Sequence, residues 1–273
     1  MKLAISTLPF KEWSVEKTVQ FCQECGYDAL EIRMDFHPWS DSSLPNEHYN
    51  ELAKLLPMHR LCVCGLGSGI VLTEYNEDAL CVLRRQLELA GILGASGVRI
   101  MLGNIRRCVS DSEKTIHWEG LVHWLQVADA LAGSFGKQVW IETHNEFATG
   151  KALHDLFAQT KLPHTAVIWD LMHPLEQEEP IEQTLSLLQG RIAHIHVKDG
   201  LPWNDPKKLI WKYTPLGEGR VPIEHAVRLL RQSGYNGYYS LEWESAWRKE
   251  LLQLNRDEEC IISFIDFMHS INK

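Results

Sequence analysis

The feature that most constrains this chain is a regular alternation of short apolar runs with longer segments of helical spacing. The runs recur at intervals of roughly 25 to 35 residues, which is typical of consecutive βα units. Eight runs are expected to form strands: Leu3–Thr7, Ala29–Arg33, Arg60–Gly65, Gly97–Leu102, Gln138–His144, Ala166–Asp170, Arg191–Lys198 and Tyr238–Glu242. No linker rich in serine or proline separates them. The pattern predicts an α/β fold in which residues 1–273 form a single (β/α)8 TIM barrel, with an open doubly wound sheet as the alternative.

Boundary signals locate two of the expected helices. Ser14 precedes Val15–Cys25, and Gly26 follows it, as expected for an N-cap and a glycine C-cap. Pro222 opens Ile223–Gln232, which Gly234 closes. After the seventh strand, residues 201–214 contain three polar or proline-rich turns, so we expect a long loop that overhangs the site end of the barrel.

Charge and composition exclude several classes of partner. The formal net charge is −9 and the pI is about 5.8, so general attraction to nucleic acid or anionic lipid is absent. The apolar run at Met1–Ser6 is too short for a signal peptide, and no later stretch approaches the length of a membrane span. Seven cysteines, an odd number, suit a reducing compartment better than a disulfide framework. We therefore expect a cytoplasmic protein that binds neither nucleic acid nor membrane.

Four neighbouring strands end in acidic or imidazole side chains. Glu142, Asp170, His196 and Glu242 terminate expected strands five to eight, so all four converge on one rim. Charges at the ends of apolar strands are costly unless they are paired or bind a cation. One divalent metal ion satisfies all four, and the oxygen-rich set suits Mn²⁺ or Mg²⁺, with Co²⁺, Fe²⁺ or Zn²⁺ also compatible. The alternative is a set of separate ion pairs with lysine and arginine on the rim.

Five short motifs follow one another in a characteristic order: Ile141-Glu142-Thr143-His144-Asn145, Trp169-Asp170-Leu171-Met172-His173-Pro174, His194-Ile195-His196-Val197-Lys198-Asp199, Leu216-Gly217-Glu218-Gly219 and Ser240-Leu241-Glu242-Trp243-Glu244. Together they resemble the xylose-isomerase-like TIM-barrel superfamily, and within it the group of sugar-phosphate isomerases, epimerases and inosose dehydratases. The resemblance covers nearly the whole chain. It implies the same four metal ligands, and it implies that His173 contacts the substrate or a second metal.

Other candidate site residues follow from strand parity and loop position. Lys198 shares parity with His196, so its ammonium is expected to polarise a carbonyl or stabilise an enolate oxygen, with a salt bridge to Glu142 or Asp199 as the alternative. Glu31 and Arg33 are expected to face the barrel interior as substrate contacts. His144 is a weaker candidate of the same kind. Arg220, with the glycine-rich turn before it, is a candidate for holding a phosphate or hydroxyls, with a simple turn as the alternative.

The resemblance also implies a mechanism. Glu142 and Glu242 match two glutamates that exchange a proton at a carbon α to a carbonyl, while the metal stabilises an enediolate. This predicts an isomerase or epimerase of a small sugar or sugar phosphate. Ketohexose 3-epimerases of the superfamily carry a further glutamate where this chain has Ala148. A dehydratase of a cyclic polyol ketone of the inosose type is therefore the nearest alternative.

Two further alternatives are favoured less. An apurinic-site endonuclease needs a three-metal cluster with additional histidines, which are absent from the ends of expected strands three and four. A non-catalytic barrel that binds a metabolite is inconsistent with a full set of metal ligands. Aromatic side chains near the expected rim, Trp203, Trp211 and Trp247, suggest a covered site or a contact in a homo-oligomer, with core packing as the alternative.

Overall fold

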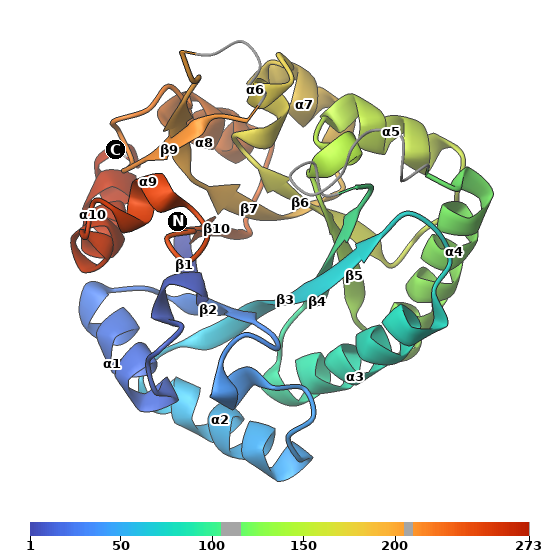
Figure 1. Cartoon of the computed structure of the whole chain (residues 1–273), viewed down its shortest axis with the longest axis horizontal. Coiled ribbons are helices and arrows are strands. Elements are labelled where there is room, and N and C mark those ends of the chain that lie inside the picture. Colours follow the sequence, from blue (N-terminus) through green and yellow to red (C-terminus); the bar gives the residue numbers. More distant parts are fainter. Residues whose placement is uncertain (105–115, 205–209, 273) are drawn as a thin grey trace.

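The computed structural model describes residues 1–104, 116–204 and 210–272. Within them, eight parallel strands close into a barrel in the order β1-β10-β7-β6-β5-β4-β3-β2 (Figure 1). Their bounds are β1 Lys2–Ser6, β2 Ala29–Arg33, β3 Cys62–Leu72, β4 Gly97–Leu102, β5 Gln138–Glu142, β6 Thr165–Asp170, β7 Ile192–Val197 and β10 Tyr238–Leu241. The predicted (β/α)8 TIM barrel is thus confirmed.

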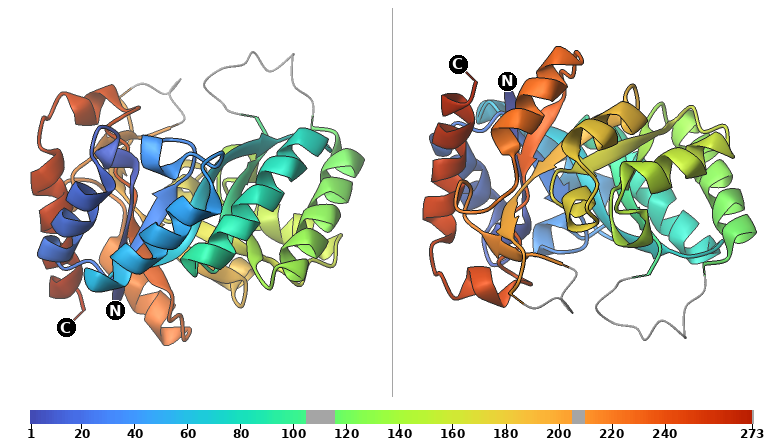
Figure 2. Two further views of the ribbon diagram at one scale, coloured as in Figure 1. Left: turned by 90° about the horizontal axis from the view of Figure 1, so that it is seen from below. Right: turned by 90° about the horizontal axis from the view of Figure 1, so that it is seen from above.

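The helices surround the strands, and the two side views show them flanking the barrel wall (Figure 2). Their bounds are α1 Val15–Cys25, α2 Asn46–Met58, α3 Glu77–Leu93, α4 Trp118–Ser134, α5 Gly150–Ala158, α6 His173–Glu176, α7 Ile181–Leu188, α8 Ile223–Gln232, α9 Lys249–Leu252 and α10 Asp257–Ser270. Single 3-10 turns occur at η1 Leu8–Phe10, η2 Pro38–Ser40 and η3 Asn145–Phe147. The last helix closes the ring on the first, because the hydroxyl of Tyr27 donates to the carbonyl of Ile261 and its ring stacks on Phe264.

Local sequence explains why α1 and α8 have these ends. The Ser14 hydroxyl accepts a hydrogen bond from the backbone N–H of Lys17, which satisfies a donor of the first turn. Gly26 then takes a left-handed conformation, with φ of 92°, that a side chain rarely adopts. Helix α8 spans the predicted residues, and Gly234 behind it also has positive φ. Both predicted helices are confirmed.

Two predicted boundaries were wrong. Strand β3 continues to Leu72 instead of ending at Gly65, because the glycine-rich stretch 65–69 hides its alternation while the backbone still pairs with β2 and then β4. The segment 201–214 is not one loop. Its ends belong to a two-stranded antiparallel sheet of β8 Asp199–Leu201 and β9 Lys212–Thr214, and its middle, 205–209, lies outside the described residues.

One large indole fills the base of the barrel. Trp140 on β5 is 3% exposed and packs with Ala166 and Ile168. Its ring occupies the space beside Gly65 and Gly97, where an added Cβ would overlap it. The two glycines are therefore required by the volume of Trp140.

This packing predicts a stability difference between two glycine substitutions. Gly97→Ala should lower the free energy of unfolding by about 1–3 kcal/mol, because the methyl group forces the buried indole to shift. Gly91→Ala in α3 should raise it by about 0.5–1 kcal/mol, because no atom lies within 4 Å of the new Cβ and alanine favours the helix. Urea unfolding of both variants tests this, and equal effects would contradict the packing argument.

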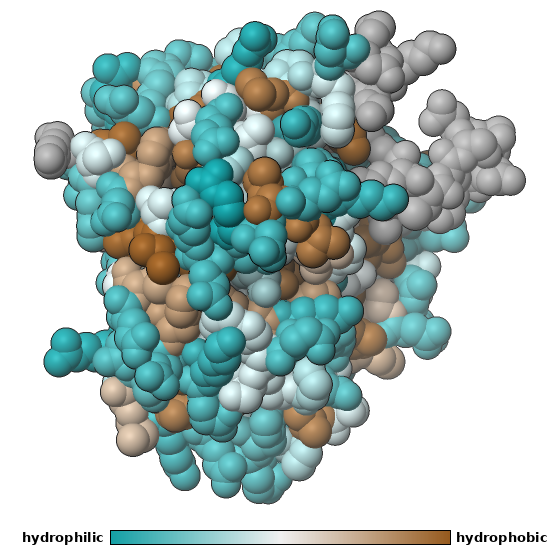
Figure 3. Space-filling view, turned by 60° about the vertical axis from the view of Figure 1, so that its left-hand side comes forward, coloured by the Kyte–Doolittle hydropathy of each residue, from teal (hydrophilic) through white to brown (hydrophobic). Residues whose placement is uncertain are grey.

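One face of the outer surface is shown in Figure 3. On the face shown in Figure 3, hydrophilic side chains predominate, and hydrophobic ones lie among them in small groups. The exposed large hydrophobic side chains include Met58, Trp247, Leu252 and Ile262. Among the helices of the described residues, none has both the length and the apolar character needed to cross a bilayer.

Candidate metal and substrate site

The four predicted metal ligands lie together at the carboxyl ends of adjacent strands. Glu142 and Asp170 are the last residues of β5 and β6, His196 lies near the end of β7, and Glu242 follows β10. Strand pairing places Asp170 opposite His196 and Ser240 opposite His196, so the side chains reach a common level. All four are at most 3% exposed, and one donor atom from each lies within 4.8 Å of the others.

The Lys198 ammonium lies against this acidic group. Its Nζ is 2.8 Å from Asp170 Oδ2 and 3.0 Å from Glu244 Oε1, and it also contacts Glu242. Burial alone would lower the pKa of Lys198, but these carboxylates raise it well above its usual value. Lys198 is therefore a fixed positive charge at neutral pH. Its salt-bridge partners include Asp170 and Glu242, in place of the expected Glu142 or Asp199.

Arg99 links the two glutamates on which the predicted mechanism depends. Its Nη1 lies 3.0 Å from Glu142 Oε2 and 3.4 Å from Glu242 Oε1, and its Nη2 donates to the carbonyl of Ser68. Sequence reasoning missed this residue, although a charged side chain inside the apolar strand β4 was a visible signal. The arginine is 6% exposed, so it holds both carboxylates in a largely water-free setting.

The two glutamates are ionised at neutral pH. Burial and the nearby Glu242 charge would raise the pKa of Glu142, but Arg99 and a hydrogen bond from His196 outweigh them and lower it to about 2. The pKa of Glu242 lies well below its usual value because His196, Lys198 and Arg99 outweigh the effect of burial. Both side chains are thus carboxylates, which can bind a cation or accept a proton.

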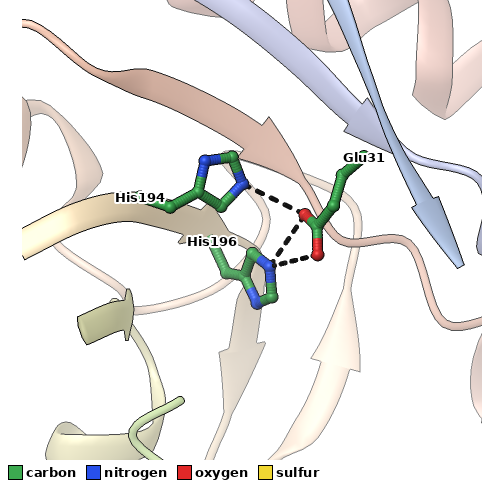
Figure 4. Close-up of side chains that lie close together, drawn as sticks. All are labelled: Glu31, His194 and His196. Atoms are coloured by element: carbon green, nitrogen blue, oxygen red, sulfur yellow. Dashed lines mark hydrogen bonds and ion pairs between the residues drawn. The ribbon is translucent and has the colours of Figure 1, made fainter. Parts of the chain in front are cut away.

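His196 is held between carboxylates on both sides, of which Figure 4 shows the Glu31 side. Its Nε2 donates to Glu31, with distances of 2.9 and 3.1 Å to the two oxygens, and Glu31 also accepts from His194 Nε2 at 3.1 Å and from the Ser240 hydroxyl. Its Nδ1 lies 3.2 Å from Glu142 Oε1. This contact pattern leaves Nδ1 as the nitrogen that faces the ligand carboxylates.

Glu31 therefore lies behind His196, away from the residues that line the pocket. Strand parity predicted that the Glu31 side chain points into the barrel, and it does. It lies below the pocket wall, however, so it contacts His196 and His194 there. His194 lies deeper still, since its ring stacks on Trp140 with centroids 5.5 Å apart. Charge and hydrogen bonding at this level support the orientation of His196.

Two histidines at the rim are neutral. Burial lowers the pKa of His173 and of His144 to about 4. His173 Nδ1 lies 2.6 Å from the carbonyl of Thr143, which only accepts, so Nδ1 carries the proton and Nε2 keeps its lone pair. His144 Nδ1 similarly contacts the side-chain oxygen of Asn145 at 2.7 Å. Both imidazoles are suited to accept a hydrogen bond from a substrate hydroxyl.

The glycine-rich turn near Arg220 does not form an open anion site. Asp199 accepts hydrogen bonds from the backbone N–H groups of Gly200, Gly217, Gly219 and Val221, at 2.8 to 3.0 Å. The donors that were expected to hold a phosphate are thus occupied by a carboxylate of the chain itself. Arg220 is exposed and lies outside the residues that line the pocket, so the alternative of a simple turn describes this segment.

A pocket of about 320 Å³ opens beside the acidic group. Its size falls at the lower end of the range for small-molecule sites. The wall combines charged, polar and apolar side chains: Leu8, Arg33, Gly69, Val71, Arg99, Met101, Glu142, His144, Asn145, Ala148, His173, Glu176, Ile210, Glu242, Glu244, Trp247 and Arg248. Of these, Glu176, Glu244 and Arg248 had no predicted role.

A TIM barrel with a buried, oxygen-rich group of side chains at the carboxyl ends of its strands defines the class of protein. The chain belongs to the family described as xylose isomerase-like TIM barrel, which matches residues 19–260. This confirms the resemblance that the five motifs indicated.

Individual relatives are distant. Fructoselysine 3-epimerase of Escherichia coli O157:H7 is 20% identical over 265 residues, which cover 92% of this chain and 93% of the relative. The structure of the IOLI protein with a zinc atom matches with a TM-score of 0.80 at 18% identity, covering 99% and 98% of the two chains. The probable 3-DHS dehydratase AsbF from Bacillus anthracis matches with a TM-score of 0.75 at 17% identity, covering 98% and 99%. The two structures share the fold.

Glu176 gives a testable pH dependence. Burial raises its pKa to about 7 from an ordinary value of 4.5, so the folded state binds more protons than the unfolded state between those pH values. Its contribution to stability therefore falls as the pH rises through this window. Glu176→Gln should become more stable relative to the wild type between pH 5 and pH 8, by about 1–2 kcal/mol.

Urea unfolding of chelator-treated protein at both pH values measures this difference. The exposed Glu51→Gln on α2 is the control and should show a constant difference from the wild type. A pH-independent effect of Glu176→Gln would mean that this carboxyl is ionised throughout the range.

Proposed function

We propose that this protein is a divalent-metal-dependent isomerase or epimerase of a small sugar or sugar derivative. The observation that carries the proposal is the convergence of Glu142, Asp170, His196 and Glu242 at one buried point beside the pocket. The epimerase name of a relative that matches over 92% of the chain supports the reaction class. The zinc atom in the IOLI structure supports the presence of a metal site in this fold.

The donor set fits a divalent cation. Three carboxylates and one imidazole supply hard oxygen ligands and one nitrogen, which suits Mn²⁺ or Mg²⁺ and is compatible with Co²⁺, Fe²⁺ or Zn²⁺. Asp170 Oδ2 and Glu242 Oε2 are buried and have no hydrogen-bond partner among the described residues, but both lie beside the Lys198 ammonium, and Glu242 Oε2 also lies 3.4 Å from His196 Nδ1. A divalent cation held there would act as a Lewis acid toward a substrate carbonyl.

The residues of the chain would then move the proton. Glu142 and Glu242 are ionised and contact Arg99 from two sides, so either one can take a proton from a carbon α to the carbonyl. The carboxyl that is protonated in this step can return the proton on the same face, and the other glutamate can deliver one from the opposite face after it has taken a proton from water. Lys198 supplies positive charge beside Glu242. The neutral His144 and His173 can accept hydrogen bonds from substrate hydroxyls and fix their orientation.

A dehydratase of a cyclic polyol ketone is the second candidate. It is favoured by Ala148, which lines the pocket and has no carboxylate where ketohexose 3-epimerases carry a further glutamate. A dehydratase name among the structural matches is consistent with it. Abstraction of the α proton is common to both reactions, so the roles of Glu142 and Glu242 are the same in either case.

The other two alternatives have less support. An endonuclease needs a cluster of several metals. The described residues hold two potential ligand groups, and both include His196. One of them, Glu31 with His194 and His196, is already joined by hydrogen bonds, so it does not offer a separate second metal site. A barrel that only binds a metabolite would not need two ionised glutamates linked by a buried arginine.

Replacing either central glutamate should abolish proton transfer while the fold persists. For Glu142→Gln and Glu242→Gln we expect at least a 1000-fold loss of deuterium incorporation from D₂O into substrate, because a general base and a ligand charge are lost together, in line with the roughly 10²–10⁴-fold contribution of acid–base catalysis alone. NMR with D-fructose, D-ribulose 5-phosphate and scyllo-inosose measures it. Exposed Glu51→Gln should retain the wild-type rate, and a wild-type rate in either central variant would contradict the mechanism.

Metal binding should also appear as stability. After EDTA treatment, deuterium incorporation should stop and Mn²⁺ should restore it. Mn²⁺ at 100 times its Kd should stabilise the protein by about 2.7 kcal/mol, seen as a higher Tm. His196→Ala should show neither the Tm shift nor bound metal by elemental analysis. Full activity after verified metal removal would refute metal dependence.

A further inference from the structure

Arg33 is a cation of the pocket wall whose charge is partly offset, from a distance, by Glu242, Glu142 and Asp35. It ends β2, and its Nη1 donates to the carbonyls of Gly67, at 2.8 Å, and Met34, at 3.4 Å. These contacts position the guanidinium but do not offset its charge. No salt bridge joins Arg33 to an acidic side chain in the described residues, and its side chain lines the pocket.

A second guanidinium faces the same pocket. Arg99 is buried, and its Nε has no hydrogen-bond partner in the part of the chain that the structure describes. Burial first, and then the charge of Arg99, lower the pKa of Arg33 to about 10, which still leaves Arg33 protonated at neutral pH. Arg99 is compensated by its salt bridges to Glu142 and Glu242. Arg33 has no such ion pair among the described residues, and the more distant Glu242, Glu142 and Asp35 only partly offset the effects of burial and of Arg99 on its pKa.

The balance of acidic and basic side chains at the site also favours the binding of an anion. Four acidic side chains, Glu142, Asp170, Glu242 and Glu244, are matched in number by four basic ones: Arg33, Arg99, Lys198 and Arg248. Glu31 is a fifth carboxylate close to the site, hydrogen-bonded to His194 and His196. A divalent cation would add two positive charges, which exceed the single negative charge of Glu31. Glu176, the remaining acid, has a pKa of about 7. The proposed metal-bound site would thus keep a positive surplus.

The surroundings of Arg33 leave its guanidinium accessible from the pocket. Gly69 lines the pocket beside it, and a Cβ added there would lie 3.5 Å from Arg33 Nη2. The absence of a side chain at this position therefore keeps one edge of the guanidinium open. Two N–H groups of a guanidinium match the spacing of two oxygens of a carboxylate or a phosphate.

We propose that Arg33, supported by the charge of Arg99, forms a subsite for an anionic group, so that the substrate is an acidic sugar or polyol that carries a carboxylate or a phosphate. The inference rests on the proposed function for the site as a whole, and it narrows the substrate class within it. The metal end of the pocket would receive the carbonyl and hydroxyl part of the substrate, and the β2–β4 side would receive the anion.

Three ligands with the same six-carbon chain test the proposal by calorimetry on the Mn²⁺-loaded protein: D-glucitol, D-gluconate and D-glucitol 6-phosphate. We expect one of the two acids to bind the wild type about 10- to 100-fold more tightly than glucitol, as for a charge-assisted hydrogen-bonded pair. The acid that gains more identifies carboxylate or phosphate. Arg33→Gln should lose this preference, Arg33→Lys should keep a part of it, and the exposed Arg84→Gln on α3 should leave it unchanged.

Equal affinity for glucitol and both acids, no binding of either acid at millimolar concentration, or an undiminished preference in a folded Arg33→Gln variant would each overturn the subsite. Calorimetry needs no turnover, so failure of the proposed reaction is seen separately. An Arg33-dependent preference in a protein that never incorporates deuterium would refute the enzyme and retain the subsite. Deuterium incorporation by the wild type, together with equal affinity for glucitol and both acids, would refute the subsite and retain the enzyme.

Discussion

The site depends on the burial of negative charge at the carboxyl ends of the barrel strands. Glu142, Asp170 and Glu242 are almost completely removed from water, where an isolated carboxylate is strongly disfavoured. Arg99 and Lys198 offset this cost, because each contacts two members of the group. Removal of one partner from such a network leaves an uncompensated charge, so these residues are coupled and their individual contributions cannot be added.

The barrel below the site supplies the positions of these charges in successive layers. Trp140 fills the base, and His194 stacks on it. Glu31 then joins His194 to His196 through hydrogen bonds, and His196 presents its other nitrogen to Glu142. Every contact in this column comes from an inward-facing strand residue, so the rigidity of the sheet is passed to the ligands. The orientation of the His196 imidazole therefore depends on the packing of Trp140 at the base of the barrel.

Much of the fold and the site composition could be predicted from the sequence, because strand periodicity, helix caps and strand-end charges are local signals. Parity placed Glu31 and Arg33 inside the barrel, but it could not give their depth, which depends on register with neighbouring strands. The partners of Lys198 could not be predicted either, since Glu244 and Asp170 reach it from two different elements. Likewise, only the folded chain brings Asp199 to the donors near Arg220.

The distribution of protons in the pocket bears on which reaction this arrangement can support. Removal of an α proton needs only an ionised carboxylate, and both Glu142 and Glu242 meet that requirement. Loss of water also needs a proton donor for the departing hydroxyl. The neutral His144 and His173 carry their proton on Nδ1, which is hydrogen-bonded within the protein, so their Nε2 atoms have no proton to give. Glu176 lines the same pocket with a pKa of about 7 and is therefore partly protonated at neutral pH. In a dehydration, the leaving oxygen can take its proton from Glu176 or from the glutamate that has just removed the α proton, whereas an epimerisation needs no proton at oxygen. The orientation of the substrate hydroxyls relative to these carboxyls therefore separates the two candidate reactions.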